Sequence, residues 1–125
     1  MKKRILLVED DRSLRRILAH YFERELINVV EACDGNNALE ILETVHSNYI
    51  DLIMTDYIMP DLNGYDMALK IREIDQFKDM PIILYTNMSH EELEKRMEDQ
   101  VFNRILHKAS TEIMINTIDE FPIRN

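Results

Sequence analysis

The chain has 125 residues, 46% of them hydrophobic, which suits one domain with a core of its own. With 15 Lys and Arg against 24 Asp and Glu, the net charge of -9 argues against a nucleic-acid or anionic-membrane partner, since both need basic patches. The single cysteine, Cys33, excludes a disulfide framework, and no apolar run approaches the roughly 20 residues of a membrane span. Because the first apolar run is also too short for a secretory signal, we expect one cytoplasmic domain over residues 1–125.

The first half of the chain predicts three strands and two helices. ILLV at 5–8 and LIM at 52–54 are apolar runs without polar alternation, as in strands covered on both faces, and INVVEA at 27–32 is a weaker strand. Apolar residues at helical spacing follow the first strand: Leu14, Ile17, Leu18, Tyr21 and Phe22. A second such stripe follows the next strand: Ala38, Ile41, Leu42 and Val45. We interpret Cys33 as a small core residue.

The second half continues the alternation. After the strand at 52–54, Asn63 and Gly64 open a helix, IILY at 82–85 is a buried strand, and RILH at 104–107 is a weaker one. Ser89 with Glu92 predicts a capping box for the fourth helix, and Ser110 or Thr111 caps the fifth. The apolar stripes of these three helices are Met67, Ile71 and Ile74; Leu93, Met97 and Val101; and Met114, Ile118 and Phe121.

Five strand–helix units in succession predict an α/β fold with a doubly wound parallel sheet. Parallel strands need crossovers, and helices then cover both faces of the sheet. Only two glycines occur, Gly35 and Gly64, so neither G-x-G-x-x-G nor the Walker pattern is present. Nucleotide binding by those routes is therefore not expected.

Charged and polar residues follow the predicted strands where each one ends. Glu9 and Asp10 follow the first strand, and Asp56 follows the third; Thr86 and Lys108 follow the fourth and fifth. In open α/β sheets these carboxyl ends meet at one edge, where ligands bind. Two carboxylates about 4 Å apart repel by roughly 4 kcal/mol at an effective dielectric near 20, so that a hard cation such as Mg²⁺ would relieve the cluster.

The same residues suit phosphoryl transfer. A cation and a fixed lysine stabilise charge on a transferring phosphoryl group. No histidine belongs obviously to this edge as a base to activate water, so the best nucleophile is Asp56 itself, which would form an aspartyl phosphate.

Over residues 4–121 the chain resembles the receiver domain of two-component response regulators, of the short, stand-alone chemotaxis-regulator type. The matching segments are ILLVEDD, DLIMTDYIMPDLNG and PIILYT, with Lys108 at the position of the family's lysine. The resemblance implies a flavodoxin-like (βα)5 sheet with strand order 2-1-3-4-5, an order that general descriptions of this fold already give for proteins of this kind.

The resemblance also implies roles. Asp56 would accept phosphate from a sensor histidine kinase or a phosphotransfer protein, while Asp10, Asp56 and the backbone carbonyl of Ile58 would hold Mg²⁺ and Glu9 would act through a water. Thr86 and Lys108 would contact phosphoryl oxygens. The face made by the fourth helix, fifth strand and fifth helix would then change its binding to a downstream protein target. We expect a monomer or weak homodimer and a switch, not an enzyme with a turnover substrate.

Two alternatives stay open. The first is an unphosphorylated pseudo-receiver that acts as a protein-interaction module. It stays open because the family often has an aromatic residue where Ile105 stands, a small residue at Asn87 and a proline at Ala109, although the complete set of site residues argues against it. A small Mg²⁺-dependent phosphatase would need an acid where Ile58 stands. If the chain is a receiver domain, we expect the apolar Ile58 and Met88 to flank the phosphoryl group and shield it from water.

Overall fold

The computed structural model describes residues 2–44 and 49–124, and within them five strands form one parallel sheet in the order β2-β1-β3-β4-β5. The strands are β1 (Arg4–Val8), β2 (Asn28–Ala32), β3 (Leu52–Thr55), β4 (Ile82–Thr86) and β5 (Arg104–His107). The predicted fold class and strand order are confirmed, and the two strands with the weaker apolar pattern, β2 and β5, are the edge strands.

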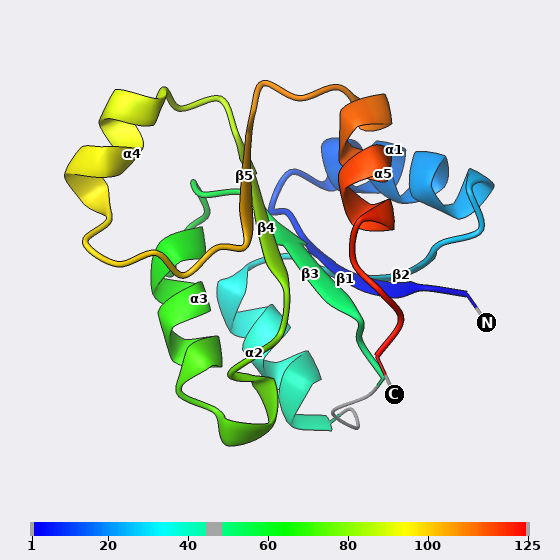
Figure 1. Cartoon of the computed structure of the whole chain (residues 1–125), viewed down its shortest axis with the longest axis horizontal. Coiled ribbons are helices and arrows are strands. Elements are labelled where there is room, and N and C mark those ends of the chain that lie inside the picture. Colours follow the sequence, from blue (N-terminus) through cyan, green and yellow to red (C-terminus); the bar gives the residue numbers. More distant parts are fainter. Residues whose placement is uncertain (1, 45–48, 125) are drawn as a thin grey trace.

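Helices cover both faces of the sheet (Figure 1). The helices are α1 (Arg12–Arg24), α2 (Gly35–Thr44), α3 (Gly64–Arg72), α4 (His90–Arg96) and α5 (Thr111–Asp119), with a short 3₁₀ helix, η1, at Asp75–Phe77. α1 and α5 lie together over one face, and α2, α3 and α4 lie over the other. Val45, in the second predicted stripe, lies outside the described residues.

Two buried clusters, one on each face of the sheet, form the core. Residues Ile5, Leu7, Met54 and Ile83 face α1 and α5, whereas their strand neighbours face α2 and α3. This alternation follows from the period of two along a strand. Because β1, β3 and β4 are buried on both faces, they read as continuous apolar runs in the sequence.

Side-chain caps set where the five described α-helices begin. At α2 the cap is Asp34, whose Oδ1 accepts from the Asn37 N–H (2.7 Å). Asp11, Asn63, Ser89 and Ser110 each accept a hydrogen bond from the backbone N–H three residues on. These bonds confirm Ser89 and Ser110 as caps. They also show that Asp11 caps α1, a different role from that of Glu9 and Asp10, which precede it.

Three expectations are corrected. In α1 only Leu18, Ala19 and Phe22 are buried, and the other stripe residues, Leu14, Ile17 and Tyr21, are 39–53% exposed. α4 ends at Arg96, because Met97 has extended backbone angles, so Val101 packs on the core from a loop and not from a helix. Cys33 is exposed at the end of β2.

Candidate functional site

The register of the sheet places three polar side chains in one row at the carboxyl edge. Val8 pairs with Thr55, and Thr55 pairs with Leu84. One residue further along each strand, the same register aligns Glu9, Asp56 and Tyr85, all on the face that α1 and α5 cover. β3 is the middle strand of the three, so Asp56 stands between Glu9 and Tyr85.

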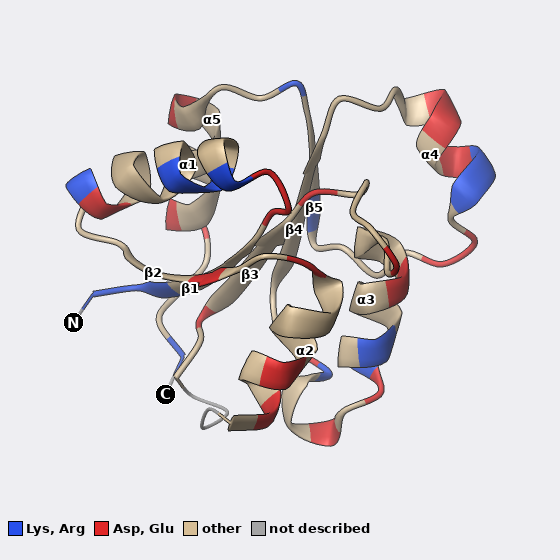
Figure 2. Cartoon of the chain, turned by 180° about the vertical axis from the view of Figure 1, so that it is seen from behind, with Lys and Arg blue, Asp and Glu red and all other residues tan. Residues whose placement is uncertain are grey.

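Glu9, Asp10 and Asp56 form one acidic cluster. Each offers a carboxylate oxygen that lies within 4.8 Å of the others. Figure 2 shows the acidic segments after β1 and β3 meeting at the edge of the sheet. Glu9 is buried, Asp56 is half-buried and Asp10 is exposed, so the cluster opens to solvent on one side.

Burial and mutual repulsion disfavour the state in which all three acids are ionised. Burial raises the pKa of Glu9 from 4.5 to about 7, and the charge of Asp56 adds to the rise. Burial also raises the pKa of Asp56, with a further contribution from Asp10. Both groups hold their protons more tightly than isolated carboxyls do, and a bound cation would reverse that preference.

Four donors hold Glu9 and Asp56. Glu9 Oε2 accepts from the backbone N–H of Asp11 (3.1 Å), and Glu9 Oε1 accepts from the Tyr85 hydroxyl (2.7 Å). Asp56 Oδ1 accepts from the N–H of Tyr57 (2.7 Å), and the N–H of Ile58 also stabilises its ionised form. Backbone N–H groups and the Tyr85 hydroxyl thus orient Glu9 and Asp56.

The loop after Asp56 folds tightly against α3. The Gly64 N–H donates to the carbonyl of Tyr57 (2.8 Å), which brings the start of α3 against the backbone of Asp56. A Cβ on Gly64 would stand 2.2 Å from the Asp56 carbonyl oxygen, so no larger residue fits there. Gly64 therefore fixes the path of the backbone at Asp56.

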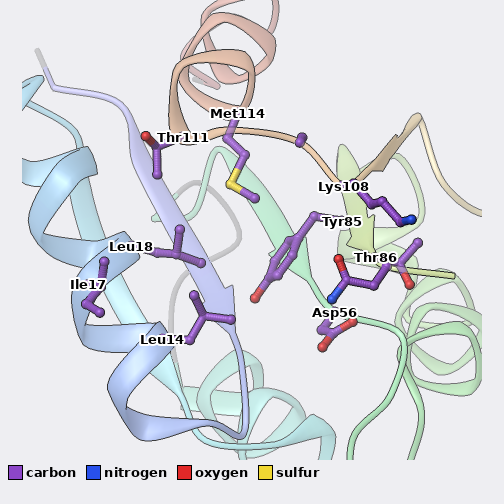
Figure 3. Close-up of a pocket in the computed structure, with 11 residues that line it drawn as sticks. Leu14, Ile17, Leu18, Asp56, Tyr85, Thr86, Lys108, Thr111 and Met114 are labelled. Carbon is purple, nitrogen blue, oxygen red and sulfur yellow. The ribbon is translucent and has the colours of Figure 1, made fainter.

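Thr86 and Lys108 lie at the ends of β4 and β5, beside the acids. Thr86 is 5% exposed, and its hydroxyl accepts from the N–H of Met88 (3.1 Å). Lys108 has φ 49°, a backbone conformation that residues other than glycine rarely adopt, and its N–H donates to the carbonyl of Thr86 (2.9 Å). Within the described part of the chain no ion pair joins Lys108 to an acid, and its side chain is directed away from Asp56 in Figure 3.

A pocket of about 480 Å³ opens beside Asp56 between α1 and α5 (Figure 3). One half is apolar and comes from the two helices and the loop before α5; the other half is polar and comes from the strand ends. The lining residues are Leu14, Ile17, Leu18, Ala109, Thr111 and Met114, and Asp56, Tyr85, Thr86, Asn87 and Lys108. Asp56 is thus reached from solvent through this pocket.

The sequence interpretation missed Tyr85 and misjudged Met88. It treated Tyr85 only as part of an apolar strand, although its hydroxyl binds Glu9. Met88 is 7% exposed and belongs to the core under α3 and α4, whereas Ile58 is 65% exposed. Met88 is therefore not placed to shield a phosphoryl group, and the shielding role of the exposed Ile58 stays a prediction.

The donor set fits Mg²⁺. It consists of oxygen atoms only, and one side of the cluster faces solvent. Burial raises the pKa of Glu9 and Asp56, and a bound cation would favour their ionised forms. Mg²⁺ prefers one or two carboxylates together with retained waters. A zinc site would instead be expected to include nitrogen or sulfur ligands, which this cluster lacks.

Comparison with known sequences identifies the relatives of this chain. A family model described as the response regulator receiver domain matches residues 5–118. The CAI-1 autoinducer sensor kinase/phosphatase CqsS of Vibrio cholerae is 30% identical over 119 residues, which are 94% of this chain and 17% of CqsS. The transcriptional regulatory protein CpxR of Escherichia coli is 40% identical over 83 residues, 66% of this chain and 33% of CpxR. The chain spans a third or less of the length of these two relatives.

Solved structures share the fold. The chemotaxis protein CheY4 of Vibrio cholerae superposes with a TM-score of 0.86 at 24% identity, over 98% of this chain and 100% of that one. The response regulator TrrA of Thermotoga maritima, solved in complex with Mg²⁺ and BeF, gives a TM-score of 0.78 at 26% identity, over 94% of this chain and 97% of that one. Across residues 2–44 and 49–124 of the present structure, no helix has the length and apolar character to cross a bilayer.

Proposed function

Because this chain belongs to the family of response regulator receiver domains, we propose that residues 1–125 form a single receiver domain that acts as a phosphorylatable signalling switch. Asp56 is the phosphoacceptor in this proposal. The observation that carries it is the cluster of Glu9, Asp10 and Asp56, whose carboxylate oxygens lie within 4.8 Å of one another beside a solvent-open pocket. Receiver domains are signalling modules, and the proposal gives this one no turnover substrate.

Asp10, Asp56 and the backbone carbonyl of Ile58 are the proposed ligands of Mg²⁺, with Glu9 acting through a water. When bound, Mg²⁺ supplies positive charge that favours the ionised acids and neutralises charge on the phosphoryl group. The complex of the related TrrA with Mg²⁺ and BeF supports the assignment. The exposure of Asp10 leaves room on the open side of the cluster for waters and a phosphoryl oxygen.

Asp56 is oriented for attack by its own backbone. The Tyr57 N–H holds Oδ1, so the other carboxylate oxygen is the proposed nucleophile. As the new bond between that oxygen and phosphorus forms, the phosphorus–nitrogen bond of a donor phosphohistidine breaks, and its electron pair returns to the imidazole nitrogen. Thr86 and Lys108 are proposed to contact the transferred phosphoryl oxygens; for Lys108 this requires a side-chain rotation toward Asp56.

The surface around the pocket suits docking of a protein donor. Leu14 and Ile17 on α1 line the pocket and are 39% and 53% exposed. Exposed apolar residues beside a reactive carboxylate favour a protein partner with an apolar face of its own. We propose a sensor histidine kinase or a phosphotransfer protein as that donor, and a downstream protein target for the α4–β5–α5 face.

The second candidate function is an unphosphorylated interaction module. Asn87 lines the pocket beside Thr86, and Ile105 is 37% exposed on β5 where the family often carries an aromatic residue. These residues favour an α4–β5–α5 face whose structure does not depend on phosphorylation of Asp56.

Beryllofluoride, an analogue of the phosphoryl group, separates the two functions. With Mg²⁺ added, the switch predicts shifts of backbone amide NMR signals at Asp56, Thr86 and β5. The same additions should leave Asp56→Asn unshifted. Wild-type protein that gives the same spectrum with and without beryllofluoride would favour the interaction module instead.

A further inference from the structure

Tyr85 lies inside the site but has no role in the proposed function. The phenol is 6% exposed, and its ring belongs to the buried cluster under α1 and α5, together with Leu18 and Met114. Among the described residues that line the pocket, it is the only aromatic one. Figure 3 shows the ring between the apolar side chains of the two helices and the polar group around Asp56.

The Tyr85 hydroxyl reaches a strand that is not its neighbour. β3 lies between β1 and β4, so β1 and β4 are roughly 10 Å apart, twice the ordinary spacing of neighbouring strands. The 2.7 Å bond from Tyr85 to Glu9 Oε1 crosses the position of Asp56. A shorter side chain at residue 85 would leave Glu9 Oε1 without this donor.

Both oxygens of Glu9 are held in this way. Oε2 accepts from the Asp11 N–H, and Oε1 accepts from Tyr85. Glu9 is 1% exposed, so water does not replace the phenol without a rearrangement of the core. The orientation of the Glu9 carboxylate is therefore fixed before a cation arrives, and second-shell donors of this kind commonly control metal affinity.

Resting on the proposed function, we propose that Tyr85 is a positioning residue of the cation site. Its hydroxyl orients Glu9 toward the cluster with Asp10 and Asp56, and its ring couples that orientation to the packing of α1 on α5. Tyr85 touches neither the phosphoryl group nor the cation in this proposal. It acts through Glu9, so its removal matters only while Glu9 is a carboxylate.

A double-mutant cycle tests this dependence. Mg²⁺ dissociation constants are measured by calorimetry for wild type, Tyr85→Phe, Glu9→Gln and the double variant. Tyr85→Phe keeps the ring and is expected to weaken Mg²⁺ binding about tenfold. The double variant should bind within about twofold of Glu9→Gln alone, because the two residues act as a unit.

Tyr65→Phe is the matched control. Tyr65 is also buried, and its hydroxyl accepts from the Asp99 N–H (3.1 Å) outside the site. This variant loses a buried hydroxyl but should keep the wild-type Mg²⁺ affinity. As a second readout, the Tyr85 ring NMR signals should shift with Mg²⁺ in wild type and stay in place in Glu9→Gln, a result that needs no substitution at residue 85.

Three outcomes overturn the proposal. If Tyr85→Phe binds Mg²⁺ as wild type does, or if the effects of the two substitutions multiply in the double variant, Tyr85 does not act through Glu9, while the proposed function stands. If wild type takes up no Mg²⁺ at all, the proposed function fails and the positioning role fails with it.

Discussion

Gly64 lies so close to Asp56 that a Cβ at residue 64 would stand 2.2 Å from the Asp56 carbonyl oxygen. The contact joins the first residue of α3 to the residue that follows β3, and it sets the path of the loop between them. Two segments of backbone meet here, so neither can yield without moving the proposed phosphoacceptor.

Gly64→Ala is therefore expected to destabilise the fold by about 1–3 kcal/mol, the usual cost of overpacking, and to slow phosphorylation of Asp56. Gly35→Ala is the matched control, since Gly35 also begins a helix but its Cβ would lie 3.1 Å from the side chain and the carbonyl oxygen of Leu62, a contact that a small shift relieves. Urea denaturation of both variants measures the difference. Equal stabilities would contradict the role given to Gly64.

Stability of the metal-free protein should fall as the pH rises toward neutral. Glu9 has a folded-state pKa of about 7 against an ordinary value of 4.5, so the folded state binds its proton more tightly. That stabilisation is complete below pH 4.5 and is lost as the pH rises through 7, by on the order of 3 kcal/mol. The raised pKa of Asp56 acts in the same direction.

Thermal unfolding between pH 4.5 and 8 checks this dependence. Mg²⁺ favours the ionised acids, so it should restore the melting temperature at pH 8 and have little effect near pH 5. Glu9→Gln should flatten the metal-free profile. A profile for Glu9→Gln as steep as that of wild type would show that another group is responsible.

Arg72 ties the end of α3 to the loop before β5. Its guanidinium donates to the carbonyls of Val101 (2.7 Å) and Met80 and to Asn103 Oδ1 (2.9 Å). Arg72→Ala is expected to cost about 2–3 kcal/mol, because it leaves part-buried carbonyls without donors. Arg104→Ala, which breaks an exposed ion pair with Glu120, should cost about 0.5 kcal/mol in the same denaturation assay. A small loss for Arg72→Ala would mean that the loop is held by its apolar contacts alone.

The lifetime of the phosphorylated form should depend on Ile58. Its side chain is 65% exposed two residues after Asp56, so Ile58→Asn is expected to admit water and shorten the lifetime severalfold. Decay of the phosphoprotein after removal of the donor measures it. Ile113→Asn, which changes an exposed apolar residue on α5, is the control. An unchanged lifetime in Ile58→Asn would remove the shielding role.

The fold class and the acidic cluster could be predicted from the sequence, because the strands and the residues that follow them are visible in it. Continuous apolar runs marked β1, β3 and β4, and the rule that the carboxyl ends of parallel strands share an edge brought Glu9, Asp10 and Asp56 together before any coordinates. Strand order came from family resemblance. The periodicity alone does not distinguish it from other doubly wound orders.

Contacts between side chains of different elements could not be predicted from the sequence. Tyr85 belongs to the row with Glu9 and Asp56 only once the register of β1, β3 and β4 is known, and apolar runs do not encode a register. The α1 stripe was wider than the face that the sheet covers, so Ile17 lines the pocket instead of the core. Val101 kept helical spacing with Leu93 although the helix between them ends at Arg96.

The most direct test of the account is phosphorylation by acetyl phosphate in the presence of Mg²⁺, followed by intact-protein mass spectrometry. Wild type is expected to gain the mass of one phosphoryl group, to gain none when the metal is chelated, and to lose the added mass in alkali, as an acyl phosphate does. Asp56→Ala should gain no mass under any of these conditions. Wild type that stays unmodified, or Asp56→Ala that is modified to the same extent, would contradict the assignment of Asp56 as the phosphoacceptor.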